Sequence, residues 1–260
     1  MKSIHVNIIP EFHNYLSLHP KLVKSCCLKL VKKVPDLIEN KSTLPIGPVI
    51  LYPENKQGFS MGPIILSYEN TYSDYNNFND ENKGNFDLIY SLFSMNSIVG
   101  KHFNNCIHIF DYMMKKEGKL LIIESSDNKN NIHYISRDLA NTSKWSNFFT
   151  NSKELNNFDD YSRSLNLIKG SCFVFKYIKR FQIDNSELKE IIGHSSLECR
   201  LLEKEDQIKF TDELCDILKK ENVLSPDMDN WILKHELSEY SKYKNDNNSL
   251  FFTSLPGFCF

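Results

Sequence analysis

Two histidines and a carboxylate near the start of the chain are the residues whose types suit metal binding. His13 and His19 stand six positions apart, and Glu11 precedes the first of them by two positions. Imidazole and carboxylate groups are ordinary zinc ligands, but this spacing matches no known zinc site, and no neighbouring residue is evident that would orient the ligands. We therefore interpret the histidines as solvated and Glu11 as a loop carboxylate, and we predict no metal site.

Nucleophilic and redox chemistry has no clear pattern in the sequence either. The seven cysteines are scattered, odd in number and without a CxxC pair, which favours neither a disulfide framework nor a zinc site. Cys26 and Cys27 are interpreted as small apolar groups on a helix face, and Asp87 as a residue that flanks a strand. No pair of nucleophile and base is evident, so no catalytic residue is predicted.

The clearest structural elements lie in the middle of the chain. Residues 86–91 form a short apolar run closed by a serine, which is typical of a strand covered on both faces. After Gly100, apolar residues recur at helical spacing as far as Met114, and Glu117-Gly118 is predicted to end that helix. Residues 119–124 then return as a second buried strand.

A strand, a helix and a strand at this spacing predict a right-handed crossover with parallel strands. Ligands of such sheets lie beyond the carboxyl ends of the strands. Those ends are residues 90–97 and residues 124–127. Residues 4–9 predict a further strand, which is expected to lie in the same sheet beside them.

The last hundred residues have a different pattern of apolar and polar residues. Residues 171–177 and 196–202 alternate apolar with small or polar residues, as antiparallel strands with one wet face do. Residues 210–221 predict a helix with Thr211 near its cap, and residues 249–255 predict a final strand. Near the other end of the chain, a helix is expected to begin at Pro20.

These elements predict an α/β fold class: a Rossmann-like sheet, mostly parallel, with antiparallel C-terminal strands. The 260 residues suit a single domain, 1–260. Periodicity is poor in residues 125–195, which are expected to form a cap or insertion.

Composition narrows the function classes. The formal charge of −2 and the pI near 6.5 argue against a nucleic-acid partner, because such proteins normally carry a basic excess. No apolar run approaches the roughly 20 residues of a membrane span, and the first residues lack the apolar core of a signal peptide. A cytoplasmic protein is expected, and its oligomeric state is not predicted.

With these elements in place, a family resemblance becomes visible. Residues 85–91, a helix and residues 117–125 resemble the middle of a class I S-adenosylmethionine-dependent methyltransferase. The tail is similar to the C-terminal run of the histamine N-methyltransferase family, in the segments Leu224-Ser-Pro-Asp-Met-Asp, Glu239-Tyr-Ser-Lys-Tyr-Lys and Ser249-Leu-Phe-Phe-Thr-Ser-Leu. Thr71-Tyr-Ser-Asp-Tyr-Asn also falls where that family has a similar segment.

The resemblance implies S-adenosylmethionine as cofactor, bound at the carboxyl ends of the parallel strands, and a small amine as substrate. The positions that match the cofactor side of the family are Glu11, Tyr15, Tyr72, Ser73 and Leu92. The positions that match the substrate side are Phe93, Ser97, Tyr134 and Thr253.

The chain departs from the family at several of these positions. Pro10-Glu11 stands where Glu-Pro is usual, Asn96-Ser97 replaces paired tyrosines, and Thr253 replaces an amide side chain. The tryptophans over the substrate are absent. No segment upstream of Ile4 supplies the first strand and its glycine-rich turn, which lets the backbone approach the cofactor. The first strand is therefore expected to be missing, in a truncated product or a degenerate relative.

Three functions are held open. The first is an S-adenosylmethionine-dependent N-methyltransferase that acts on a small, histamine-like amine. Methyl transfer depends largely on positioning and a dry pocket, so it needs no dedicated acid or base. The second is a catalytically inactive relative that serves as a binding or subunit protein. The third, another Rossmann-like enzyme, requires a phosphate-binding turn that the sequence does not show.

Overall fold

The computed structural model describes residues 4–10, 13, 16–33, 42–53, 83–95, 110–126, 128–150, 152 and 173–243. In chain order the elements are β1 (Ile4–Ile8), α1 (Pro20–Lys33), β2 (Thr43–Ile46), β3 (Val49–Pro53), β4 (Phe86–Leu92), β5 (Met114–Ser125), α5 (Ile132–Ala140), α6 (Ser146–Phe149), β6 (Phe173–Asp184), α8 (Leu188–His194), α9 (Leu197–Arg200), α10 (Lys204–Lys220), β7 (Leu224–Asp227) and β8 (Asn230–Tyr243). Most of the helix predicted after Gly100 and the final strand predicted at residues 249–255 lie outside the described residues.

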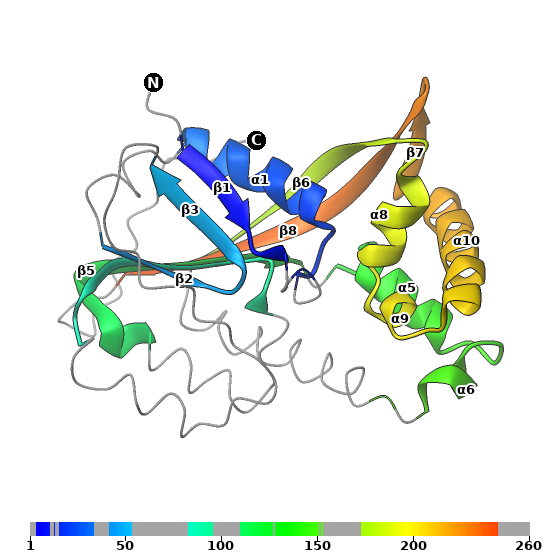
Figure 1. The fold of residues 1–260 in the computed structure, drawn as a ribbon, viewed down its shortest axis with the longest axis horizontal. Helices are drawn as coiled ribbons and strands as arrows, with labels where there is room; N and C mark the ends of the chain where they lie inside the picture. The colour runs from blue at the N-terminus through cyan, green and yellow to red at the C-terminus, as the bar shows by residue number, and fades with distance from the viewer. Residues whose placement is uncertain are drawn as a thin grey trace.

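The fold is α/β and is built on one mixed sheet. Five strands follow the order β2-β4-β5-β8-β6, and β7 pairs with β8 outside this path. Strands β2, β4 and β5 run parallel, whereas β8 runs antiparallel to both β5 and β6. The predicted fold class, with a parallel part and antiparallel C-terminal strands, is confirmed (Figure 1).

The first strand does not join this sheet. Residues 4–8 form a strand as predicted, but β1 pairs antiparallel with β3 in a separate two-stranded sheet. The prediction that it lies beside the parallel strands is therefore wrong. Val6 and Ile8 are half-buried and Asn7 is exposed, which suits a ribbon with one wet face. The place beside β4 is taken by β2, whose four residues are all buried.

The Glu117-Gly118 pair lies inside β5 and not at a helix end. Pairing between β4 and β5 jumps from Phe86 with Met114 to Leu88 with Lys119, which marks a bulge. Glu117 adopts a positive φ of 65° in this bulge, a conformation that is uncommon for residues other than glycine. The prediction that the preceding helix extends to Glu117 is wrong, because the strand already begins at Met114.

Two predictions in the C-terminal half also need correction. The strand predicted at residues 196–202 is wrong: this segment contains the short helix α9, because the Ser196 side chain accepts a hydrogen bond from Cys199 N and caps a helical turn. The helix predicted from Phe210 is confirmed but begins at Lys204. Thr211 therefore lies within α10, where it is buried, and not near its cap.

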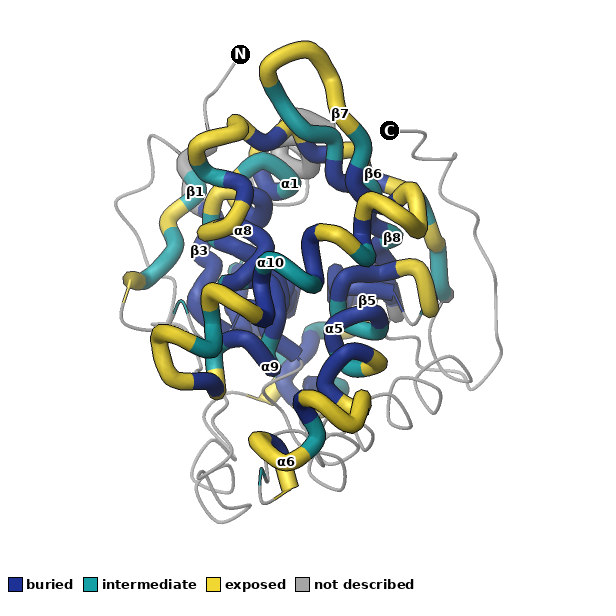
Figure 2. Tube along the Cα trace, turned by 90° about the vertical axis from the view of Figure 1, so that its right-hand side faces the viewer, coloured by how far each residue is buried: buried dark blue, intermediate teal, exposed yellow. Residues whose placement is uncertain are grey.

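The labelled helices of the described residues lie in two places around the sheet. Figure 1 shows α1 beside the sheet, and α5, α6, α8, α9 and α10 gathered beyond one end of it. Buried side chains from both groups belong to the same core cluster as β4 and β5. Figure 2 shows buried and exposed stretches alternating along α10, as expected of a helix with one face on the core. None of the helices in the described part is long and apolar enough to span a bilayer.

Candidate functional site

The carboxyl ends of β2, β4 and β5 meet at one edge of the sheet, because these strands run parallel. At this edge Phe93 leaves β4 with a positive φ of 59°, and its N–H donates to the Ile123 carbonyl at 2.8 Å. The segment that precedes α1 crosses the same edge. The N–H of Ser17 donates to the Phe93 carbonyl at 2.8 Å. The segment before α1 therefore closes the strand ends.

Glu124 lies at the centre of this edge and is fully buried. Its carboxyl group accepts hydrogen bonds from Met95 N at 2.5 Å and from Ser17 Oγ at 3.2 Å. Burial raises the pKa of Glu124 to about 8, although the hydrogen bonds from Met95 and Ser17 act in the opposite direction. Glu124 is therefore mostly protonated at neutral pH, and it links β5, the end of β4 and the segment before α1.

A single glycine turn follows β2 at this edge. Gly47 has a φ of 93°, and a Cβ atom added there would lie 2.6 Å from Ser94 Cβ. Ser94 Oγ donates to the Ile46 carbonyl at 3.1 Å and lies 3.0 Å from Ser91 Oγ. The ends of β2 and β4 are therefore in contact through the hydroxyls of Ser91 and Ser94, and this close approach is possible because Gly47 has no Cβ atom.

Ser125, the last residue of β5, stands between two imidazoles. Its Oγ lies 2.8 Å from His133 Nε2 and 2.9 Å from His235 Nε2. Burial lowers the pKa of His133 to about 4, with the Arg200 charge adding to the effect, and burial lowers that of His235 well below its usual value. Both rings are neutral at pH 7, so a hydroxyl between them can accept from one and donate to the other.

We expect Ser125→Ala to lower the free energy of unfolding by roughly 1–3 kcal/mol, because two largely buried imidazole nitrogens lose their shared partner. Urea unfolding at pH 7 measures this change. Ser125→Thr, which keeps the hydroxyl, is the matched control and is expected to recover part of the loss. Equal stability of the alanine variant and the unmodified chain would contradict the arrangement.

The loop that follows β5 is fixed to β8. Asn131 Nδ2 donates to the carbonyls of Ser126 and Glu236 at 2.9 Å each, and Asn131 Oδ1 accepts from Glu236 N at 2.8 Å. The Glu236 carboxylate accepts from Ser126 Oγ and from Asn128 Nδ2. The helix that carries His133 begins directly after Asn131, so these bonds position His133 over the strand end.

Three of the nine predicted site residues lie in the described part of the chain. Leu92 and Phe93 are brought together with Ile123 around a small hollow. Tyr134 lies on α5, next to His133. The other six predicted residues lie outside the described residues: Glu11, Tyr15, Tyr72, Ser73, Ser97 and Thr253.

The hollow beside Leu92 and Phe93 is too small for the implied cofactor. Its volume is about 10 Å³, which accommodates about one water molecule, whereas small-molecule sites typically measure about 300–1,000 Å³. Side chains from other elements close the space, namely Cys26, Cys27, Tyr177 and Lys179. The described residues at these strand ends therefore do not by themselves fit S-adenosylmethionine.

The interpretation of His19 as a solvated residue is wrong. Its exposed fraction is 7%, its N–H donates to Ser195 Oγ, and its ring lies 5.0 Å from the His194 ring. Burial lowers the pKa of His19, with Glu190 acting against this effect. In the part of the chain that the structure describes, no group of three or more histidine, cysteine or acidic side chains is arranged to hold a metal.

The sequence predicted where the carboxyl ends of the parallel strands lie, but it did not predict most of the polar side chains that meet there. Glu124 stood in the predicted strand end, yet its burial and its bond to Ser17 carry no local signal. His235 is 110 positions from Ser125, and only the pairing of β5 with β8 brings the two strands together. The alternation of apolar and polar residues along β8 was the signal available for placing His235 in a strand.

Comparison with known proteins gives weak likenesses. No family model and no curated protein sequence matches this chain. Among solved structures, a Bacillus halodurans protein described as a methyltransferase matches at 12% identity and TM-score 0.31, over 63% of this chain and 66% of its own. The YcgJ protein of Bacillus subtilis matches at 9% identity and TM-score 0.33, over 64% and 66%. A Haemonchus contortus phosphoethanolamine N-methyltransferase 2 matches at 10% identity and TM-score 0.28, over 63% and 34%.

The matched regions span less than two thirds of the length of each of these neighbours. At these identities and TM-scores, the likenesses establish neither a family nor an activity for this chain.

Proposed function

We propose that the chain is an S-adenosylmethionine-dependent N-methyltransferase-like protein of class I descent that acts on a small amine. The observation that supports this most is the order of the sheet. Parallel β2, β4 and β5 are followed by an antiparallel β8, which is inserted between β5 and β6. This is the combination of parallel and antiparallel strands that the sequence resemblance implies.

The proposed cofactor side consists of Glu11, Tyr15, Tyr72, Ser73 and Leu92, and the proposed acceptor side of Phe93, Ser97, Tyr134 and Thr253. Transfer to an amine needs the amine in its neutral form and a site that excludes water. The neutral Glu124, His133 and His235 near the strand ends suit such an uncharged environment. A histamine-like acceptor and a cytoplasmic location are part of the proposal.

Thermal unfolding with and without ligand tests the cofactor. We expect S-adenosylhomocysteine at about 1 mM to raise the melting temperature, because a ligand that binds only the folded state stabilises it, by about 2.7 kcal/mol at a hundredfold excess over Kd. Adenosine and homocysteine, supplied separately at the same concentration, are the controls. The absence of a shift with S-adenosylhomocysteine would contradict cofactor binding.

A second candidate, a catalytically inactive relative that acts as a binding protein, is favoured by the small hollow at the strand ends. The bond from Ser17 to Glu124 supports it further, because it closes the same edge. A direct assay separates the two candidates. Transfer of a radiolabelled methyl group from S-adenosylmethionine to histamine or another small amine by the purified 260-residue chain eliminates the inactive relative.

A further inference from the structure

Two pairs of imidazole rings lie where the C-terminal helices meet the rest of the fold. His133 on α5 lies edge-on to His235 on β8, with ring centroids 5.4 Å apart and planes at 90°. His194 at the end of α8 lies in the same way against His19, which directly precedes α1, with centroids 5.0 Å apart and planes at 83°. Each pair therefore joins a helix beyond the end of the sheet to an element on the other side of this boundary (Figure 1).

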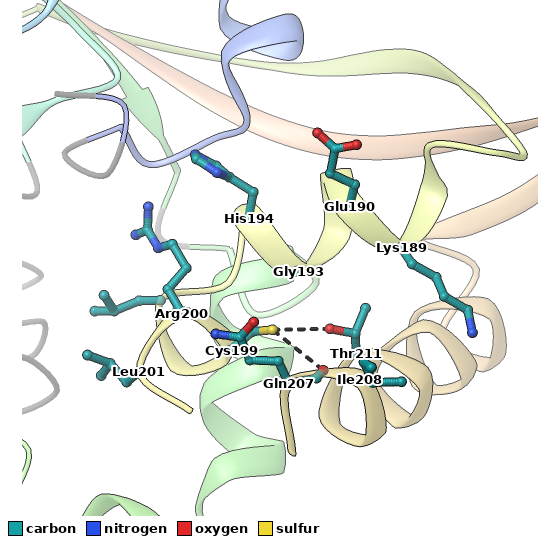
Figure 3. Close-up of a pocket in the computed structure, with 11 residues that line it drawn as sticks. Lys189, Glu190, Gly193, His194, Cys199, Arg200, Leu201, Gln207, Ile208 and Thr211 are labelled. Carbon is teal, nitrogen blue, oxygen red and sulfur yellow. Dashed lines mark hydrogen bonds between the residues drawn. The ribbon is translucent and has the colours of Figure 1, made fainter. Parts of the chain in front are cut away.

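The turn that ends α8 links the two pairs. Its cap residue is Ser195, whose Oγ accepts a hydrogen bond from His19 N at 3.1 Å and whose backbone bonds to His133. Figure 3, drawn around the cavity that α8, α9 and α10 line, shows His194 extending toward the segment that precedes α1. We name His19, His133, His194 and His235 the histidine junction, since one turn connects all four.

The histidine junction suits neutral rings and not charged ones. His19 and His235 are buried, and His133 and His194 are half-buried. His235 Nδ1 and His194 Nε2 are each shielded from solvent and have no hydrogen-bond partner among the described residues. A proton on either nitrogen would therefore be a buried donor without an acceptor, which is unfavourable.

The charges that face the His133–His235 pair also disfavour a proton. Arg200 on α9 acts on His133, and Lys179 lies opposite His235 on β6. In the part of the chain that the structure describes, no carboxylate acts on either ring. Burial lowers the pKa of His133 to about 4, with Arg200 adding to the effect, and burial lowers the pKa of His235 well below its usual value.

His194 is in a similar position. The titratable and charged groups that face its ring are Arg200, His19 and His13, and none of these is a carboxylate. Burial lowers the pKa of His194 to about 4, and Arg200 is the next contributor. The same guanidinium therefore disfavours a proton on His133 and on His194.

His19 is the ring of the junction that faces carboxylates. Glu190 Oε1 lies 3.5 Å from His19 Nε2, with Glu187 on the same side and Lys21 acting against both. Burial nevertheless lowers the pKa of His19, because it outweighs the effect of Glu190. All four rings therefore gain a proton less readily in the closed junction than in water.

We propose that the histidine junction is an acid-sensitive contact, which releases the C-terminal helices from the strand ends when its rings are protonated while the parallel strands stay folded. Protonation favours the open state because a released ring is solvated and no longer faces Arg200 or a second ring. The strand ends respond to acid in the opposite direction, since the buried Glu124 is neutral at low pH. The proposal is independent of methyl transfer.

The pH range of the opening follows from the pKa values. Above about pH 6.5, the usual histidine pKa, a ring is neutral in both states and does not affect the equilibrium. Between about pH 6.5 and pH 4 only the open state gains the proton, so the closed state loses stability as the pH falls. At pH 5, His133 and His194 are each expected to shift the equilibrium toward the open state by about 30-fold.

Hydrogen exchange of single amides, measured by NMR at pH 7.5 and pH 5.0 and corrected for the intrinsic rate at each pH, tests the proposal. Two amides donate across the junction: His19 N to Ser195 Oγ, and Glu236 N to Asn131 Oδ1. We expect both to lose protection by at least about 100-fold at pH 5.0. Phe93 N, which bonds to the Ile123 carbonyl within the sheet, is expected to keep its protection.

Two variants are expected to change the response in opposite directions. His194→Phe keeps an aromatic ring against His19 but removes one titrating group, so the loss of protection at His19 N should be about 30-fold smaller. Glu190→Gln removes the carboxylate that favours a proton on His19, so the loss should be about twofold larger. The Glu190 side chain is 72% exposed, so this variant is expected to fold and keeps the test decisive if His194→Phe does not.

Unchanged protection of His19 N and Glu236 N between the two pH values would overturn the proposal. An equal loss at Phe93 N would also overturn it, because it would show that acid unfolds the whole chain. A folded His194→Phe protein with an undiminished loss, or a Glu190→Gln protein with a smaller loss, would contradict the role given to these rings.

Discussion

Gly47→Ala is expected to lower the free energy of unfolding by about 3 kcal/mol or more. Gly47 has a φ of 93°, where a residue with a Cβ atom is strained. The new Cβ would lie 2.6 Å from Ser94 Cβ and closer still to Ser94 Oγ, inside any normal contact distance. Since Ser94 Oγ also donates to the Ile46 carbonyl, displacing it breaks a bond between β2 and β4. Urea unfolding of the two proteins measures the difference.

A second substitution separates the two causes. Gly47→Ala combined with Ser94→Gly relieves the collision but not the backbone strain, so we expect the double variant to be less destabilised than the sum of the two single changes. Purely additive effects would show that the contact with Ser94 does not matter. A Gly47→Ala protein as stable as the unmodified chain would contradict the positive φ itself.

The parallel pair β4 and β5 was predictable because its signal is local. Each strand contains a short apolar run, at residues 88–90 and 120–123, and runs of this kind are buried on both faces of a parallel sheet. The start of α1 at Pro20 was predictable for a similar reason, since proline suits a first helical turn. In both cases a few neighbouring residues decide the structure.

The partner of a strand was not predictable in the same way. The short strand β2 reads Thr-Leu-Pro-Ile, and its proline weakens the local strand signal, yet it takes the place beside β4 that was assigned to residues 4–9. Strand β8 pairs with both β5 and β6. Its pairing with β5 joins residues that are more than a hundred positions apart, such as Ser125 and Leu237. Which strands pair depends on how much apolar surface each possible arrangement of the whole sheet buries, and no short segment of the sequence records this.

In the candidate site, too, some features follow from local sequence and others only from the packing of distant segments. The position of the edge followed from the direction of two strands, and the described part of the predicted edge, residues 90–95 and 124–126, lies at the ends of β4 and β5. The ionisation of its groups did not follow, because the protonation of Glu124 depends on its burial in the packed edge, where its hydrogen-bond partner Ser17 is 107 positions away in the sequence. Side-chain ionisation of this kind is a property of the packed molecule.

The burial of Glu124 gives the second large expected effect, a dependence of stability on pH. The pKa of Glu124 is about 8 in the folded chain, above the value of about 4.3 expected when unfolded. Between these values the folded state binds more protons than the unfolded state, so the contribution of Glu124 to stability is full below about pH 4 and is lost as the pH rises through 8. The expected loss is of the order of 5 kcal/mol.

Glu124→Gln isolates this contribution, because an amide has the shape of the protonated acid. Its oxygen can accept from Met95 N. Its nitrogen can donate to Ser17 Oγ once that hydroxyl, which donates to Glu124 in the unmodified chain, has rotated. We expect this variant to match the unmodified chain within about 1 kcal/mol at pH 5 and to be the more stable of the two at pH 8.5. The difference between the two proteins at each pH cancels the titration of His133 and His235, which both proteins share.

Glu124→Leu, which leaves the buried Met95 N–H without an acceptor, is expected to be less stable than the unmodified chain at pH 5. Parallel stability curves for the glutamine variant and the unmodified chain would mean that Glu124 is already ionised in the folded protein, and the closed strand end would then have to be held by a buried carboxylate instead of a neutral acid.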